Sequence, residues 1–537
     1  MSEHLGHNEY GYLGDSDAED TDRTLTVDVE EFFTNEHDRR AWERCRQLAG
    51  SIKDEGGQAM LVGGGVRDVL FGKSPKDLDV EVYRIEPDQL RTILDGFVSL
   101  HHGRINEVGA AFGIVKIALP DRDGDSGGSD IDLDVSLPRT ENRIGVGHKD
   151  FAVAADPWMS IEEAASRRDF TINSLAMDVL TGEIYDHFGG VEDLQAHILR
   201  VTDEEKFRED PLRVLRGMQF VARMGLTADS ETADIMKSMV PELRHLPAER
   251  LKEEWTKLFL KSERPSIGLE AAKDWGVLAE MHPILDGLSE VLQDKEWHPE
   301  GDVWTHTLMA VDKAAQITKH MQKDEKLAVM LGALCHDLGK ITATSHDSDG
   351  RIRSHGHDTA GAELTKQLLK EMGFEDKDLS KKVVNLVTNH MAPTTLYEER
   401  DKIKDGAIRR LATRIYPASI PELVAVTQAD YQGRGRLESE RASLASSWLL
   451  ERAVSLQINV GEKPKPIIGG RDLMEMGLSP GKYFGEILKN CERLNYLGLD
   501  RPTILGIVRQ VVDNHGVSPE WIIEAMEKEI IALGGEI

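Results

Sequence analysis

The 537-residue sequence has only three cysteines, no long apolar run and a shortage of positive charge. Cys45, Cys335 and Cys491 lie far apart and match no metal-binding spacing, so we expect reduced thiols rather than a disulfide framework. No stretch approaches the roughly 18 consecutive apolar residues of a membrane span, and the first residues are acidic, unlike those of a signal peptide. These absences predict a cytoplasmic protein without a membrane segment.

Lysine and arginine (65 residues) are outnumbered by aspartate and glutamate (95 residues), which leaves a formal net charge of −30. Nonspecific nucleic-acid binding depends on cations that neutralise phosphates, so the overall charge argues against it. A local exception, the basic strip, consists of Arg200, Lys206, Arg208, Arg213, Arg216 and Arg223. The strip is either a solvated helix face or a place where an acidic ligand binds.

Hydrophobic patterning divides the chain into an α/β part and a longer helical part, so the predicted fold class is α+β. Residues 1–38 are polar and acidic, which predicts a mobile extension. Residues 39–185 mix strand-like and helical patterns. In the segments 186–296, 297–440 and 441–537, apolar residues recur mainly at the spacing of an α-helix. A chain of this length is too long for one hydrophobic core, so we expect several domains.

A glycine turn followed by two aspartates is the most informative local pattern. A strand-like run, 59–62, leads into the turn 63–65, and a second strand-like run carries Asp77 and Asp79. Side chains alternate along a strand, so both carboxylates face the same side. Glycines let backbone N–H groups approach a phosphate, and paired carboxylates suit a Mg²⁺ ion that bridges phosphate oxygens. The unit predicts a metal-dependent nucleotidyl-transfer site.

Two further segments of the α/β part look like strands. Residues 108–119 are largely apolar, and residues 131–137 alternate so that Asp130, Asp132 and Asp134 share one face. The glycine- and aspartate-rich segment 120–128 between them predicts a flexible hairpin loop.

Asp210 and Arg213 form a second pattern, in the segment Glu209-Asp-Pro-Leu-Arg213. Pro211 suits the first turn of a helix, and residues three apart lie on one helix face. One interpretation is a helix cap with an ion pair. The other is base selection, because a carboxylate that accepts from an exocyclic amine, beside a guanidinium that donates to a ring nitrogen, would accept C and A and reject U and G.

Five ordered motifs between about residues 55 and 260 resemble class II tRNA nucleotidyltransferases and bacterial poly(A) polymerases. They are Leu61-Val-Gly-Gly-Gly-Val-Arg-Asp68, Asp77-Leu-Asp79, Arg167-Arg-Asp-Phe-Thr-Ile-Asn173, Gly189-Gly-Val-Glu-Asp-Leu194 and Glu209-Asp-Pro-Leu-Arg213. The resemblance implies a polymerase-β-like head (39–185) and a helical neck and body (186–296). It also implies the addition of C and A to tRNA 3′ ends from CTP and ATP, without a nucleic-acid template.

The same resemblance implies a role for each matching residue. Asp77 and Asp79 would be catalytic and hold Mg²⁺, while Gly64 and Arg67 would contact the triphosphate. The nucleotide pocket and the protein template for the base would comprise Arg168, Asp169, Asp210 and Arg213, with Arg216 as a further family arginine. This chain departs from many relatives at Gln219, where they have another arginine.

A second set of candidate ligands follows in the helical part. An apolar run ends in the adjacent pair His336-Asp337, and buried charge normally needs a partner or a metal. The full set is His306, His336, Asp337, His357, His390 and Asp430. Its order resembles the HD phosphohydrolase superfamily over about 300–435, within the predicted domain 297–440.

That resemblance implies an all-α domain in which His306, His336, Asp337 and Asp430 bind one divalent metal. His357 and His390 would complete a second site, and His355 competes with His357 for that role. A transition metal such as Mn²⁺, Ni²⁺ or Co²⁺ would activate water against 2′,3′-cyclic phosphates, 2′-nucleotides or phosphorylated RNA ends. The helical tail 441–537 also resembles nucleotidyltransferases of this type.

Several alternatives remain open from the sequence. A poly(A) polymerase would share the same head, although a basic Gly-Arg-Arg-Phe type of segment is replaced here by Gly109-Ala-Ala-Phe-Gly113. Some relatives add only CC or only A, and the motif residues do not separate these activities. An RNA-binding module with an inactive head is the non-enzyme alternative, against which Asp77 and Asp79 argue.

Overall fold

The computed structural model describes residues 25–75, 77–106, 114–121, 130–143, 151–348, 350–434, 436–458, 466–515 and 518–533. Contacts divide the chain into two compact units, Met1–Leu246 and Pro247–Ile537. The acidic residues 1–24, the loop 122–129 and the Gly109–Gly113 segment, on which predictions were made, lie outside the described residues.

A seven-stranded sheet forms the centre of the first unit, in the order β3-β4-β5-β2-β1-β8-β9. Its strands are β1 (Gln58–Val62), β2 (Asp79–Tyr83), β3 (Arg104–Asn106), β4 (Ile114–Leu119), β5 (Ile131–Ser136), β8 (Ala176–Asp178) and β9 (Ile184–Tyr185). β2 and β5 pair in parallel, with Asp79 opposite Asp134, whereas the other described pairs of this sheet are antiparallel. A separate hairpin joins β6 (Arg139–Arg143) and β7 (Phe151–Ala155).

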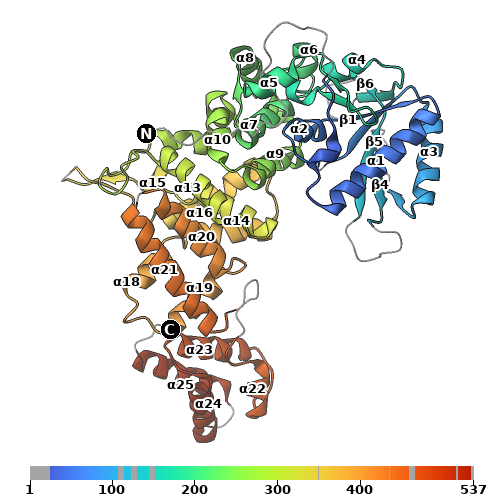
Figure 1. Cartoon of the computed structure of the whole chain (residues 1–537). Coiled ribbons are helices and arrows are strands. Elements are labelled where there is room, and N and C mark those ends of the chain that lie inside the picture. Colours follow the sequence, from blue (N-terminus) through green and yellow to red (C-terminus); the bar gives the residue numbers. More distant parts are fainter. Residues whose placement is uncertain are drawn as a thin grey trace. The chain divides into compact units, whose positions relative to one another are not determined.

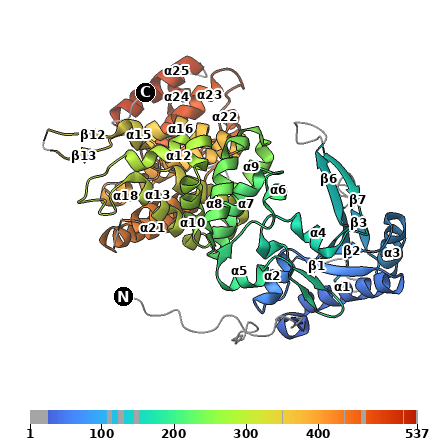
Figure 2. The ribbon, with the colours of Figure 1, turned by 90° about the horizontal axis from the view of Figure 1, so that it is seen from above.

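Helices α1 (Glu36–Asp54) and α3 (Pro87–Leu100) pack against each other and against the sheet (Figures 1 and 2). α1 begins at the Asn35 cap, whose side chain accepts from the Asp38 N–H, as caps of this type commonly do. The chain packs on the head earlier than the predicted boundary at residue 38, because Val27 and Val29 are buried and Val27 N–H donates to the Gly182 carbonyl.

The glycine turn joins β1 to α2 (Gly64–Leu70) and places this helix against the second strand. Gly63 has a φ of +67°, which favours glycine. A side chain at Gly65 would come within 2.8 Å of the Asp77 carbonyl. The Gly-Gly-Gly segment therefore brings α2 directly onto the chain that enters β2.

Short helices follow the sheet within the first unit. They are α4 (Ile161–Ser166), α5 (Gly190–Gln195), α6 (Glu204–Phe207), α7 (Leu212–Met224) and α8 (Ser230–Met239). Strands β10 (Ile198–Leu199) and β11 (Thr227–Ala228) pair in parallel. α7 is strongly amphipathic, with its apolar side buried around Phe170 and Phe220, and it ends at Gly225 in the left-handed conformation.

The second unit is mainly helical. Its helices up to residue 455 are α9 (Ala248–Lys261), α10 (Pro265–Asp274), α11 (Val277–Met281), α12 (Pro283–Asp286), α13 (Val303–Ile317), α14 (Lys323–Cys335), α15 (Lys340–Ala343), α16 (His357–Glu371), α17 (Lys377–Val387), α18 (Ala392–Glu398), α19 (Asp405–Ile415), α20 (Ile420–Gln432) and α21 (Arg436–Ser455). A small hairpin joins β12 (Ser345–His346) to β13 (Ile352–Arg353). From Leu327 to Cys335, α14 is apolar all round and buried, and the helix packs against α13, α17 and α20.

Four further helices have a hydrophobic core of their own at the end of the chain. They are α22 (Gly470–Glu475), α23 (Phe484–Tyr496), α24 (Arg501–His515) and α25 (Pro519–Ala532). Leu494, Ile504 and Ile522 are fully buried within this core. Among the described residues, no helix combines the length and apolar character needed to cross a bilayer.

Candidate functional sites

Three carboxylates converge where β2 and β5 run side by side. Asp79 opposes Asp134 in the parallel register, and exposed Asp77 lies just before β2. Burial raises the pKa of Asp79, and the charges of Asp134 and Asp77 raise that pKa further. Such a concentration of negative charge fits a hard divalent cation, because carboxylate oxygens are the ligands that Mg²⁺ and similar ions take. We describe these carboxylates as the head cluster.

Basic residues flank the head cluster. Glu81 follows Asp79 by two residues on β2, so the two side chains lie on the same face of the strand. Arg168 lies 3.3 Å from the Glu81 carboxylate, and Lys116 donates to Asp134 at 2.7 Å. Glu81 also accepts from the Tyr83 hydroxyl at 2.6 Å. Asp134 and Glu81 were not among the predicted site residues. The alternating aspartates of β5 were a signal for Asp134, but only the β2–β5 pairing shows which of them faces Asp79.

A cavity of about 380 Å³ opens beside the head cluster. Its charged lining residues are Asp79, Glu81, Asp134, Arg139, Arg167, Arg168 and Arg213. The structure therefore brings Arg213, from the helical segment, to the same cavity as the Asp-x-Asp motif. Arg139 and Arg167 are additional lining cations that the sequence predictions did not include.

Asp210 and Arg213 are fixed by the start of α7. The Asp210 carboxylate accepts from the Leu212 N–H at 3.1 Å, as a helix cap does. The Arg213 guanidinium donates to the carbonyls of Lys206 (3.0 Å) and Arg167 (2.6 Å), and burial lowers its pKa. These contacts hold the Arg213 side chain in one orientation while it lines the cavity.

Arg67, Asp169 and Arg216 belong to one polar network. Arg216 donates to Asp169 at 2.6 Å, Asn173 donates to the same carboxylate at 2.7 Å, and Arg67 donates to Asn173. Although burial by itself raises the pKa of Asp169, the Arg216 charge and these hydrogen bonds hold it below its ordinary value. Gly64 is the first residue of α2 and lies beside the Arg67 guanidinium.

Much of the basic strip is engaged within the protein. Arg200 pairs with Asp193 and Asp229, and Arg208 pairs with Glu204 at 2.8 Å. The remaining members contact Glu209, Gln219, Asp169 and backbone carbonyls. The strip therefore stabilises the helical segment, and its charges are less available to an acidic ligand than the sequence alone indicates.

The predicted ligands of the second unit meet at one buried cluster, the HD cluster, made of His306, His336, Asp337, His357, His390 and Asp430. His306 Nε2 lies 3.0 Å from Asp430 Oδ1 and 3.2 Å from His336 Nε2. Asp337 lies between two of the histidines, with Oδ2 3.3 Å from His336 Nε2 and Oδ1 3.3 Å from His357 Nε2. His390 offers a ligand atom within 4.8 Å of those of Asp337 and His357.

Three histidines of the HD cluster are oriented by hydrogen bonds from Nδ1. His336, His357 and His390 donate from Nδ1 to the carbonyls of Ala333, Ser354 and Val387, at 2.7–2.8 Å. A carbonyl only accepts, so these rings carry the proton on Nδ1 and present Nε2 to the cluster. Nε2 of His357, Nε2 of His390 and Oδ1 of Asp337 are buried without a hydrogen-bond partner. Buried nitrogen and oxygen atoms with free lone pairs are suitable ligands for a pair of divalent metal ions.

Burial lowers the pKa of His390 to about 4, so that ring is neutral at pH 7 and can act as a ligand. His357 is the first residue of α16 and is buried, whereas His355 is exposed before that helix. The geometry therefore places His357, and not His355, beside the other residues of the HD cluster. A glycine is required at position 339, because a Cβ atom there would lie 1.9 Å from the His357 carbonyl oxygen.

Three residues around the HD cluster were missed from the sequence. Glu300 Oε1 lies 2.8 Å from Nδ1 of His306 and also 2.8 Å from Nδ1 of His298. Lys340 pairs with Asp337 Oδ2 at 2.7 Å, and Arg434 donates to both oxygens of Asp430. The sequence did contain a signal for two of them. Lys340 follows Asp337 by three residues and Arg434 follows Asp430 by four, and such spacings bring side chains together in a helical turn.

These features define a nucleotidyltransferase head joined to a helical HD unit, and both families imply dependence on divalent metal. Three family models match the chain. They are the "Poly A polymerase head domain" over residues 59–200, the "Probable RNA and SrmB- binding site of polymerase A" over 225–288, and the "HD domain" over 303–431.

The chain is similar to curated proteins along most of its length. It is 34% identical over 438 residues to the multifunctional CCA protein of Xanthomonas campestris pv. campestris (strain B100), which covers 80% of this chain and 96% of that protein. It is 32% identical over 416 residues to the multifunctional CCA protein of Vibrio parahaemolyticus serotype O3:K6, with 75% and 92% covered. The chain belongs to the multifunctional CCA protein family.

Solved structures show the same fold at lower identity. The apo form II of a CCA-adding enzyme has a TM-score of 0.57 and 18% identity, covering 94% of this chain and 97% of that one. The Bacillus stearothermophilus CCA-adding enzyme in complex with CTP has a TM-score of 0.56 and 19% identity, covering 92% and 99%. The predicted α+β fold class and family are confirmed.

Proposed function

We propose that this protein adds C and A to the 3′ ends of tRNA from CTP and ATP, and that its HD unit hydrolyses phosphoesters at RNA ends. The observation that carries the first activity is the convergence of the head cluster and Arg213 on one cavity. Membership of the multifunctional CCA protein family favours CCA addition over poly(A) synthesis. Whether one chain adds all three nucleotides is tested with tRNAs that lack one, two or three terminal residues, each given CTP or ATP separately.

In the head, Asp77, Asp79 and Asp134 would hold Mg²⁺. When bound, the cation neutralises phosphate charge and makes the RNA 3′-hydroxyl a better nucleophile. Arg67 and the first turn of α2 would bind the triphosphate, with Arg168 beside Glu81 at the cavity wall. The carboxylates position the reacting groups, and the arginines counter the charge of the leaving pyrophosphate.

Asp210 and Arg213 would read the Watson–Crick edge of the incoming base. Two backbone carbonyls fix the Arg213 guanidinium, and a preorganised donor discriminates better than a mobile one. The hydrogen bond from Arg216 to Asp169 ties α7 to the segment that follows α4. This arrangement would select C and A by hydrogen bonding, without a nucleic-acid template.

Arg213→Ala should relax base selection. One good bidentate contact to a base is worth about 1–3 kcal/mol, so the ratio of CTP to UTP incorporation should fall by about 5- to 150-fold. The measurement is kcat/KM for each nucleotide on the same truncated tRNA. Arg208→Ala is the matched control, because Arg208 is an exposed arginine of the same segment that pairs with Glu204. An unchanged ratio in Arg213→Ala would assign base selection to other residues.

In the HD unit, His306, His336, Asp337 and Asp430 would hold one metal, and His357 and His390 would complete a second site with Asp337. Imidazole and carboxylate donors suit Mn²⁺, Ni²⁺ or Co²⁺. When bound, such an ion supplies activated water and polarises the phosphoryl group. The substrate class would be 2′,3′-cyclic phosphates, 2′-nucleotides and phosphorylated RNA ends, which such a unit would remove before nucleotide addition.

Glu300→Gln should weaken metal binding by the HD unit by about 10- to 100-fold, because the carboxylate orients His306 and increases its basicity. Metal affinity is measured by titration calorimetry with Mn²⁺ on the full chain stripped by a chelator. Glu300→Asp should restore part of the affinity, and Glu296→Gln, an exposed neighbour, should leave it unchanged. Wild-type affinity in Glu300→Gln would show that His306 needs no carboxylate partner.

We also propose a cytoplasmic location. Cys45, Cys335 and Cys491 are free and buried, as expected where thiols stay reduced. The substrates proposed above are those of a cytoplasmic RNA-processing enzyme.

A further inference from the structure

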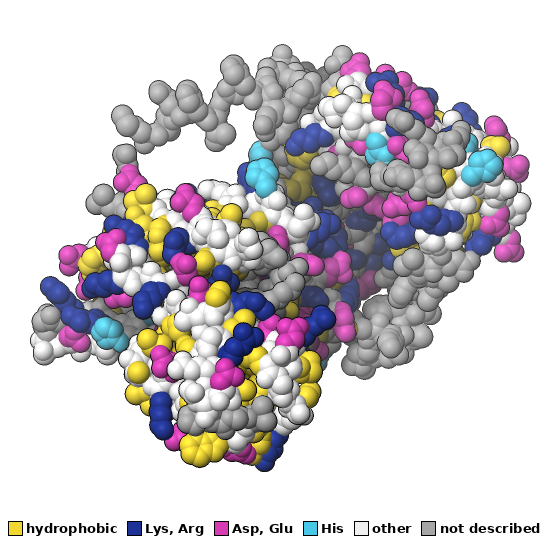
Figure 3. Space-filling model, turned by 90° about the horizontal axis from the view of Figure 1, so that it is seen from below, with side chains coloured by type: hydrophobic (Ala, Val, Ile, Leu, Met, Phe, Trp, Pro, Cys, Tyr) yellow, Lys and Arg dark blue, Asp and Glu magenta, His cyan; other side chains and the backbone are white. Residues whose placement is uncertain are grey.

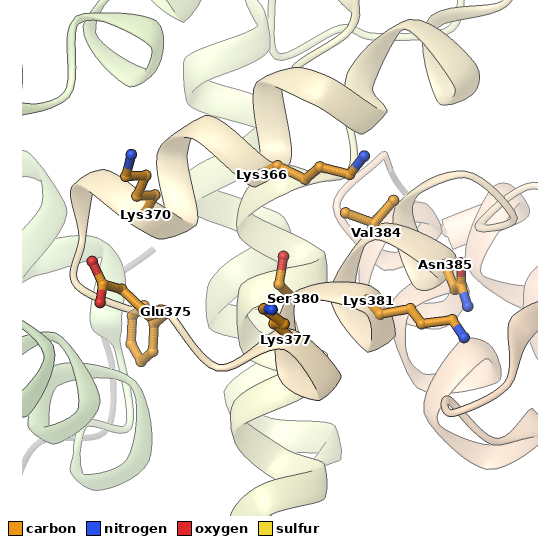
Figure 4. A pocket seen from close by; sticks show the side chains of 9 residues that line it. Lys366, Lys370, Glu375, Lys377, Ser380, Lys381, Val384 and Asn385 are labelled. Atoms are coloured by element: carbon orange, nitrogen blue, oxygen red, sulfur yellow. The ribbon is translucent and has the colours of Figure 1, made fainter.

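A groove between α16 and α17 carries four lysines in an otherwise acidic protein (Figure 4). Its volume is about 540 Å³, and its lining includes Lys366, Lys370, Lys377 and Lys381 against a single acidic residue, Glu375. We refer to it as the lysine groove. By contrast, basic and acidic side chains are interspersed on the face shown in Figure 3.

Local sequence builds the lysine groove. Lys366 and Lys370 are four residues apart on α16, and Lys377 and Lys381 are four apart on α17, so each helix presents a pair on one face. The turn between the helices is tight, because Gly373 has a φ of +84° and packs onto the Ala248 carbonyl. Two packed helices and a fixed turn hold the lysine backbones in place.

The charge of these lysines is available to a ligand. Among the described residues, Lys370, Lys377 and Lys381 have no ion-pair partner, and all are exposed. Lys366 pairs with exposed Glu363, a contact that contributes little in water. The neighbouring Glu371 and Lys382 are engaged elsewhere, with His282 and Glu422 respectively. The groove therefore differs from the basic strip, in which Arg200 and Arg216 pair with the buried carboxylates of Asp193 and Asp169.

The lysine groove is separate from the HD cluster. Lys366 follows His357 by about two and a half helical turns, so the two side chains leave opposite sides of α16. Within the lining, the only aromatic ring is Phe374, which is 2% exposed and so offers no face for stacking with a base. A row of flexible ammonium groups without a stacking platform suits a phosphate backbone rather than a nucleotide base.

We propose that the lysine groove binds the phosphate backbone of the tRNA body, at a place separate from the HD cluster. This assignment rests on the proposed function, since tRNA is the substrate named there. It also accounts for how a chain with a net charge of −30 holds a polyanion: a few unpaired lysines act locally.

The test is a full-length variant with Lys366→Gln, Lys370→Gln, Lys377→Gln and Lys381→Gln, compared with a control in which Lys53, Lys295, Lys323 and Lys402 are changed to glutamine. The control positions are exposed, lie outside the groove and change the net charge equally. Binding of a tRNA lacking its 3′ CCA is measured over a range of salt, together with KM for tRNA and for CTP.

The groove variant should bind tRNA about tenfold more weakly, and the slope of log Kd against log salt should fall by about three. KM for CTP, and hydrolysis of bis(p-nitrophenyl) phosphate by the HD unit, should match the control. Equal tRNA affinity and salt slope in the groove variant and the control would overturn the assignment while leaving the proposed function intact. A raised KM for CTP with unchanged tRNA affinity would overturn it in favour of a nucleotide site. A wild-type chain that adds no nucleotide to truncated tRNA would contradict the proposed function and the groove assignment together.

Discussion

Asp79→Asn is expected to reduce the addition of both C and A by about a thousandfold or more. The substitution keeps the shape of the side chain but removes a charge that would hold the divalent cation beside the reacting phosphate. A loss of about 4 kcal/mol of transition-state stabilisation corresponds to that factor. Because burial and the Asp134 and Asp77 carboxylates already raise the pKa of Asp79, removing its charge relieves repulsion and should leave the fold intact. The measurement is single-turnover incorporation of labelled CTP and ATP into truncated tRNA.

Asp88→Asn, on the exposed first turn of α3, is the matched control and should retain activity. The HD unit of Asp79→Asn should hydrolyse a small phosphodiester at the wild-type rate. Substantial CTP incorporation by the variant would contradict the assignment of the head cluster as the catalytic centre.

Asp337→Asn should abolish hydrolysis by the HD unit and leave nucleotide addition almost unchanged. Asp337 approaches His336 and His357 with its two oxygens and would bridge both metals, so its loss should remove hydrolysis by about a thousandfold. The amide has nearly the same volume, which keeps α14 packed. Nucleotide addition should stay within about twofold of wild type, because the head residues are independent of this cluster. The measurements are hydrolysis of a 2′,3′-cyclic nucleotide and bound metal per chain by elemental analysis.

Asp324→Asn is the matched control, because Asp324 lies exposed at the start of α14, the helix that ends just before His336 and Asp337. It should behave as wild type. Wild-type hydrolysis by Asp337→Asn, or loss of nucleotide addition with retained hydrolysis, would place the hydrolytic site elsewhere.

Local chemistry was readable from the sequence wherever a residue type is required by its immediate neighbours. The three consecutive glycines predicted a tight turn, because a positive φ or a close approach of backbone segments excludes side chains. The structure has a positive φ at Gly63 and a close backbone approach at Gly65. The six predicted HD ligands meet in one cluster because adjacent His336 and Asp337 end an apolar helix, where unpaired polar groups are costly.

Contacts between distant segments were not readable in the same way. Asp134 was recognised as part of an alternating strand, yet Asp130, Asp132 and Asp134 are equivalent in that pattern. Only the parallel pairing of β2 with β5 places Asp134 opposite Asp79. Likewise, nothing near Glu300 in the sequence shows that it contacts Nδ1 of His306.

By itself, the sequence determined the fold class and the family and indicated the candidate site residues, because these follow from periodicity, turn requirements and motif spacing along the chain. The tertiary structure decided which charges remain available. It pairs Arg200 and Arg208 of the basic strip with Asp193, Asp229 and Glu204, and it leaves Lys370, Lys377 and Lys381 without an ion-pair partner among the described residues. The physical reason is that a charge is neutralised by whatever folding brings within a few ångströms of it, and sequence order does not record those distances.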